Sequence, residues 1–167
     1  MLLLILLASA VAPFPDFVPH VITDDMPGAY CVRASDVDGD GRVDVIVQGR
    51  EVVWFKNPTW ERFPIVSETS GNIFLAPQDV TGDGLPEIVL ASDFSLAKSS
   101  EGGTLTLLER AADLTEPWTH REIGAEPTAH RLYWAELDGK APQNCWLPRF
   151  SDAVRSNQPT ISRPSSS

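Results

Sequence analysis

Asp36-Val-Asp-Gly-Asp-Gly-Arg-Val-Asp-Val-Ile-Val47 is the stretch that says most about the fold of this chain, because it occurs a second time. The segment Asp79-Val-Thr-Gly-Asp-Gly-Leu-Pro-Glu-Ile-Val-Leu90 aligns with it without a gap, 43 residues further along. A weaker third copy, Glu136-Leu-Asp-Gly139, follows the aromatic pair Tyr133-Trp134. An internal repeat of this length predicts an array of similar units rather than one irregular domain.

The regions around the copies have the pattern of short β-strands. Apolar or alternating runs, each bounded by Gly, Pro, Asn or Asp, occupy Val43–Val47, Glu51–Phe55, Glu87–Ala91 and Thr104–Glu109. Gln48-Gly49-Arg50 predicts a hairpin turn between the first two runs. No window of helical length has a sustained apolar stripe at helical spacing. We therefore expect an all-β fold, a partial β-propeller of about two to three blades with calcium-binding loops.

The two acidic loops, residues 36–44 and 79–87, have the composition of a site for a hard cation. Calcium prefers oxygen ligands, and side chains at alternate positions converge on one point when glycine lets the backbone curl tightly. The ligands that we expect are the side chains of Asp36, Asp38, Asp40, Asp44, Asp79, Thr81, Asp83 and Glu87 and the backbone carbonyls of Arg42 and Leu85. Because Thr81 replaces a carboxylate with a neutral hydroxyl, we expect the second loop to bind Ca²⁺ more weakly.

An EF-hand and a metal-free turn are the two alternatives for these loops. An EF-hand requires a glutamate at position twelve and a helix on each side, whereas position twelve is Val47 in one loop and Leu90 in the other. A metal-free turn fits the composition, since aspartate and glycine favour turns in any case. Two gapless copies that each lead into a strand favour the metal-binding interpretation.

The motif Asp-x-Asp-x-Asp-Gly-x-x-Asp followed by a strand, present in repeated copies, resembles the FG-GAP/VCBS repeats of the integrin α-chain N-terminal propeller type. The resemblance covers roughly residues 25–140. It implies a β-propeller with Ca²⁺ held in loops between blade strands, in an extracellular protein that serves adhesion or ligand binding. In the third copy Lys140 occupies the third ligand position after Glu136 and Asp138, so we expect no ion there.

Charge and the N-terminal residues limit the partners and the compartment. The net charge of −10 disfavours binding to phosphate backbones, so we expect no nucleic-acid partner. The apolar run Met1–Ala12 is too short for a membrane span, which needs roughly 20 residues. It fits a signal peptide, which predicts a secreted or periplasmic/extracellular protein without a membrane span. A buried first strand and a misassigned start codon are the alternatives.

No nucleophile-elbow, zinc-protease, Walker or dinucleotide-binding motif occurs in the chain, so we expect no enzymatic activity. Histidines His120 and His130 are interpreted as surface residues, and the recurring tryptophans Trp54, Trp60, Trp118 and Trp134 as packing residues. The predicted function is an exported calcium-binding module that serves as a binding, adhesion or scaffold unit for an unknown protein or carbohydrate ligand. The alternative is a truncated fragment of a propeller-type polysaccharide-acting enzyme.

The expected organisation is a signal peptide over 1–12, repeats over 13–140 and a disordered Ser/Pro-rich tail over 141–167. Pro142 and Pro148 interrupt the segment after the third copy, so we expect no strand there. An incomplete array would leave an open blade edge and an uncovered apolar face, which predicts self-association. Cys31 and Cys145 leave two alternatives open, a disulfide or two buried thiols.

Overall fold

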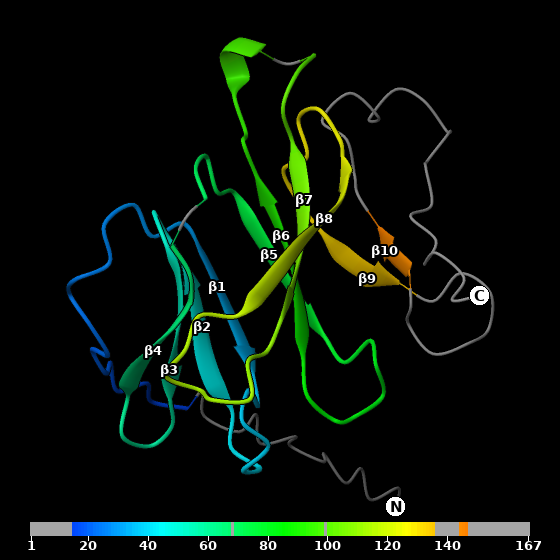
Figure 1. Ribbon diagram of the computed structural model, residues 1–167. Helices are drawn as coiled ribbons and strands as arrows, with labels where there is room; N and C mark the ends of the chain where they lie inside the picture. The colour runs from blue at the N-terminus through cyan, green and yellow to red at the C-terminus, as the bar shows by residue number, and fades with distance from the viewer. Residues whose placement is uncertain (1–14, 68, 99, 136–143, 147–167) are drawn as a thin grey trace, which may run out of the picture.

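The computed structural model describes residues 15–67, 69–98, 100–135 and 144–146, and these residues form an all-β structure (Figure 1). The predicted fold class is confirmed at this level. The described helical structure is limited to one short 3-10 segment, η1 (Leu96–Lys98). Within the described residues, no helix has the length and apolar character needed to cross a membrane. The expected signal peptide, Met1–Ala12, lies outside the described residues.

The first sheet contains four antiparallel strands in chain order, β1 (Cys31–Ser35), β2 (Asp44–Gln48), β3 (Val52–Lys56) and β4 (Glu61–Val66). Each strand therefore pairs with the next one along the chain, as in a meander. The turn around Gly49 joins β2 to β3, where the sequence predicts a hairpin turn. The register places Val45 opposite Phe55.

The second sheet repeats this arrangement with β5 (Phe74–Gln78), β6 (Glu87–Ser92), β7 (Thr104–Glu109) and β8 (Thr119–Ala125). The first strands of the two sheets, β1 and β5, begin 43 residues apart, which is the spacing of the sequence repeat. The two copies of the motif therefore belong to two copies of one four-stranded unit.

A third unit begins with β9 (Tyr133–Ala135), which pairs with β10 (Asn144–Trp146). The expectation that no strand follows the third copy is therefore corrected for these three residues. The two prolines, Pro142 and Pro148, flank β10 instead of interrupting it. The rest of the predicted tail, 141–143 and 147–167, lies outside the described residues.

The main core lies between the two four-stranded sheets and extends to the segment that leads into β9. All six residues of β6 are buried, because this strand has packing partners on both faces. The first strands of the units lie next to one another, β1 beside β5 and β5 beside β9. Arg33 connects two of them, since its Nε donates a hydrogen bond to the carbonyl oxygen of Leu75 at 3.0 Å.

The four tryptophans that recur in the repeats all pack in or against apolar clusters, as predicted. Trp54 and Trp118 are buried in the main core, and Trp134 is half-buried against it. Trp60 packs against a smaller apolar cluster on the other face of the first sheet. Cys31, at the start of β1, is a buried free thiol, and the side chain of Cys145 lies outside the described part of the chain.

The face of the first sheet that points away from the second sheet carries Val47, Val53 and Phe55, and all three are buried. Ile22 and Met26, from the segment before β1, pack against them. We name residues 22–26 the N-terminal strap. The expectation of an uncovered apolar face is corrected here, because a short length of preceding chain covers it.

Candidate metal centre

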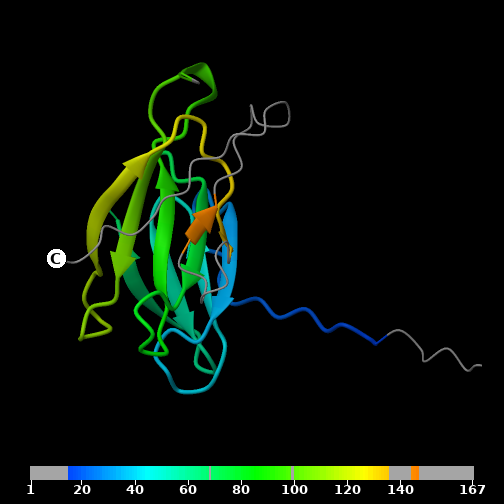
Figure 2. The ribbon, with the colours of Figure 1, turned by 90° about the vertical axis from the view of Figure 1, so that its right-hand side faces the viewer.

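Both acidic loops join the first two strands of a sheet. Residues 36–43 connect β1 to β2, and residues 79–86 connect β5 to β6. The loops lie at the same end of the molecule, and η1 lies at the opposite end (Figures 1 and 2). They also lie close to each other, because a Cβ atom added to Gly39 would stand 3.0 Å from Cδ2 of Leu85.

The first loop is shaped by Asp36, the residue that follows β1. One carboxylate oxygen accepts the N–H of Gly39 at 2.8 Å, and the other accepts the N–H of Gly41 at 2.9 Å. Both glycines have a positive φ, 79° and 83°, which a residue with a side chain adopts only at a cost in free energy. The aspartate and the two glycines together curl the backbone around one point.

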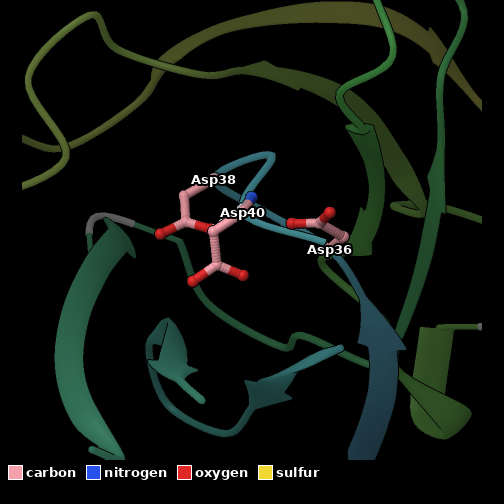
Figure 3. Close-up of side chains that lie close together, drawn as sticks. All are labelled: Asp36, Asp38 and Asp40. Atoms are coloured by element: carbon pink, nitrogen blue, oxygen red, sulfur yellow. Dashed lines mark hydrogen bonds between the residues drawn. The ribbon is translucent and has the colours of Figure 1, made fainter. Parts of the chain in front are cut away.

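Three of the predicted ligands meet at this point. Asp36, Asp38 and Asp40 each place a carboxylate oxygen within 4.8 Å of the other two (Figure 3). A backbone hydrogen bond from Arg42 to Asp40, at 2.9 Å, fixes the third carboxylate and lowers its pKa. The Arg42 guanidinium lies 3.5 Å from the same carboxylate. Among the described residues, this is the one group of three acidic, histidine or cysteine side chains that is close enough to share a metal ion.

Asp44, the predicted closing ligand, lies outside this group of three. Its side chain is fully buried, and its two oxygens accept backbone N–H groups from Val37 at 2.9 Å and from Asn57 at 2.8 Å. Burial raises the pKa of this carboxyl group, and the two hydrogen bonds oppose the shift. Asp44 therefore holds the start of the loop and the end of β3 together.

The second loop repeats the backbone scaffold of the first. Asp79 accepts the N–H groups of Gly82 and Gly84 at 2.6 and 2.9 Å, as Asp36 does for its two glycines. Asp83 accepts the N–H of Leu85 at 2.9 Å, which is the counterpart of the hydrogen bond between Asp40 and Arg42. The two loops therefore share one local fold, as the alignment of their sequences predicts.

The closing acid of the second loop has a different set of partners. Glu87 is buried and accepts the N–H groups of Val80 and Thr81 at 2.8 and 3.2 Å. Thr81, at a predicted ligand position, donates its hydroxyl hydrogen to Glu87 at 3.1 Å. The structure therefore brings no third carboxylate to the second loop where the first loop has Asp38. The third copy, with Glu136, Asp138 and Lys140, lies outside the described residues.

Lys56, the last residue of β3, is a member of the first site that the sequence analysis missed. Its Nζ atom pairs with Asp38 and lies 3.5 Å from Asp40. The hydrogen bond to Asp38 raises the pKa of the lysine. The signal that identifies it is strand register, which the sequence does not show: the observed pairing of Val45 with Phe55 places Lys56 opposite Asp44.

The residues of the first loop fit a calcium ion. The donors are carboxylate oxygens, which are the ligands that this hard cation prefers, and they converge within a few ångströms of one another. A positively charged group, the Lys56 ammonium, already lies against two of the three carboxylates. Part of the negative charge of the group is therefore balanced by a residue of the same chain.

Part of the chain matches a known protein family. Residues 36–90 match the model of a family described as an FG-GAP-like repeat. The matched span includes both acidic loops and the strands from β2 to most of β6. The resemblance to FG-GAP repeats noted in the sequence is thereby confirmed for these residues. No curated protein matches the chain.

Proposed function

We propose that this chain, whose residues 36–90 form an FG-GAP-like repeat, is an exported β-propeller-type module whose loops bind Ca²⁺ for structural reasons. The module serves as a binding, adhesion or scaffold unit, and its partner is a protein or a carbohydrate. No catalytic role is part of this proposal. Export is inferred from the signal-peptide character of Met1–Ala12.

The convergence of Asp36, Asp38 and Asp40 is the observation that carries the calcium proposal. Three carboxylates whose oxygens lie within 4.8 Å of one another repel each other when no cation is present. A divalent cation among them replaces this repulsion with attraction. Calcium, when bound, supplies a central charge that several oxygens share.

Such an ion would stabilise the fold by linking two strands. Each loop joins the first strand of a sheet to the second strand, so a bound ion ties these two strands together at one end. Because the unfolded chain does not hold the carboxylates in this arrangement, the free energy of binding adds to the free energy of folding. The resemblance to integrin-type repeats supports a role of the assembled surface in ligand binding.

Thermal unfolding with and without calcium tests this proposal. We expect EDTA to lower the melting temperature and added Ca²⁺ to restore it. A free concentration one hundredfold above Kd would stabilise the chain by about 2.7 kcal/mol per site. Asp40→Ala should abolish binding at the first loop, and Asp83→Ala should abolish it at the second. Calorimetry that detects no calcium uptake at millimolar concentration would contradict the proposal.

A further inference from the structure

The two loops share one backbone scaffold but differ in the cations that surround them. In the first loop, the Lys56 ammonium pairs with Asp38 and lies 3.5 Å from Asp40. The Arg42 guanidinium lies 3.5 Å from Asp40 as well. The side chain of Asp38 is only 5% exposed, so its contact with the ammonium is shielded from solvent. Part of the negative charge of this loop is therefore balanced from within the chain.

Strand register identifies the residue that takes the place of Lys56 in the second sheet. Ile88 pairs with Leu108, so the next pair outward places Glu109 opposite Glu87. In the first sheet, Val45 pairs with Phe55, so the next pair outward places Lys56 opposite Asp44, the acid that corresponds to Glu87. A carboxylate therefore stands in the second sheet where the first sheet has an ammonium.

The second loop has no internal counter-ion among the described residues. Leu85 occupies the position of Arg42, and no lysine or arginine of the described chain pairs with Asp79 or Asp83. Glu109 is 43% exposed and lies 3.5 Å from Nε of Arg121. Within the described part of the chain, nothing therefore balances the negative charge of this loop.

We infer that Lys56 is the resident cation of the first loop, so that Ca²⁺ fills the second loop before the first. This inference rests on the proposed calcium function and assigns different roles to the two sites. At the first loop, the ammonium must leave two carboxylates before a metal ion can use them. At the second loop no ammonium or guanidinium of the described chain has to be displaced. This order of filling is the reverse of the order expected from the sequence, where Thr81, a neutral residue in place of a carboxylate, predicts weaker Ca²⁺ binding at the second loop.

The charge-removing variant Lys56→Met tests this directly, because methionine keeps most of the aliphatic side chain and removes the ammonium. Arg50→Gln is the matched control, since it removes one positive charge from the exposed turn at the other end of the same hairpin. Calorimetry gives the calcium affinities, and the NMR signals of the backbone amides report which loop is filled. We expect Lys56→Met to tighten binding at the first loop about tenfold and Arg50→Gln to leave it unchanged.

The reciprocal variant Glu109→Lys places a lysine beside the second loop. Because the side chain of Glu109 is half-buried at the end of β7 and outside the core, this variant keeps the experiment decisive even if Lys56→Met folds poorly. We expect calcium binding at the second loop to weaken about tenfold while binding at the first loop stays as in the wild type.

The outcomes separate the inference from the proposed function. The inference is overturned if both loops bind calcium but Lys56→Met binds no more tightly than Arg50→Gln. It is also overturned if the first loop of the wild type fills before the second. If the loop amides respond to calcium in none of the four proteins, the proposed function fails and the inference fails with it.

Discussion

Asp44 shows how one acidic side chain stabilises a loop before any metal is considered. It has no exposed surface, and each of its oxygens accepts a backbone N–H, from Val37 on one side and from Asn57 on the other. The aspartate thereby joins the loop that leaves β1 to the turn that follows β3. A buried carboxylate is unfavourable by itself, and these hydrogen bonds offset that cost.

We predict that Asp44→Ala lowers the free energy of unfolding by about 3 kcal/mol even in EDTA, because two buried N–H donors lose their acceptor. Asp83→Ala is the control, since its single hydrogen bond lies in an exposed loop and water can replace it. Under the same conditions we expect Asp83→Ala to cost about 0.5 kcal/mol. Urea unfolding measures both values. Equal losses in the two variants would mean that the two buried hydrogen bonds of Asp44 stabilise the fold no more than the exposed hydrogen bond of Asp83 does.

At the scale of elements, the strands with continuous apolar runs were predictable and the strands at the sheet edges were not. β2, β3, β6 and β7 lie in the middle of their sheets, and the sequence predicts all four within about two residues. β4 and β5 contain Pro64 and Pro77, which argue against a central strand. Both strands lie at a sheet edge, where a missing N–H is tolerated. β8 is mostly exposed and polar, so it lacks the apolar signal.

In the candidate metal site, too, some features were predictable from the sequence and others were not. The spacing of Asp36, Asp38 and Asp40 in the sequence sufficed to predict that they converge, because the three lie in one tight loop. The contribution of Lys56 depends on the pairing of two strands, which composition and spacing of the loop do not contain. One of the two partners of Asp44, the N–H of Asn57, likewise comes from a turn that follows the next strand. Local chemistry was predictable, and contacts that require strand register were not.

Gly103 marks a place where three elements of the second sheet meet. Its φ is +76°, its N–H donates to the carbonyl of Asp93 at 3.1 Å, and its own carbonyl accepts the N–H of Glu126 at 2.7 Å. A Cβ atom at this position would stand 1.8 Å from the carbonyl oxygen of Glu126. The ends of β6, β7 and β8 are therefore held together by backbone atoms that leave no room for a side chain.

We predict that Gly103→Ala lowers the free energy of unfolding by more than about 3 kcal/mol, because the backbone must shift to relieve the clash. Gly84→Ala is the matched control: its φ is +89°, but no atom lies within 4 Å of the added Cβ. We expect it to cost about 1–2 kcal/mol, the penalty of the left-handed backbone alone. Thermal or urea unfolding in EDTA compares the two. Similar losses would show that backbone conformation, and not the contact with Glu126, limits position 103.

At the scale of the whole molecule, the arrangement of the units determines which apolar sheet faces a neighbouring unit buries and which need another segment to bury them. The second sheet is packed on both faces, by the first sheet and by the segment that leads into β9. The first sheet has the second sheet on one face only. Its other face is covered by the N-terminal strap, in which Ile22 and Met26 contact Val47, Val53 and Phe55. The strap thus takes the place that a neighbouring unit would occupy in a longer array.

This role of the strap predicts how single charges near the N-terminus affect association. Ile22→Asp should detach the strap, because a carboxylate does not pack against an apolar cluster, and the loss of packing should cost about 1–2 kcal/mol. The uncovered face would then present buried apolar side chains to solvent, which favours contact between two copies. Val21→Asp is the control, since Val21 is 85% exposed and the added charge is the same. Analytical ultracentrifugation over a range of concentrations should show more self-association for Ile22→Asp than for the wild type or Val21→Asp. If the sedimentation of Ile22→Asp matches that of Val21→Asp at every concentration, the strap does not protect this face from association.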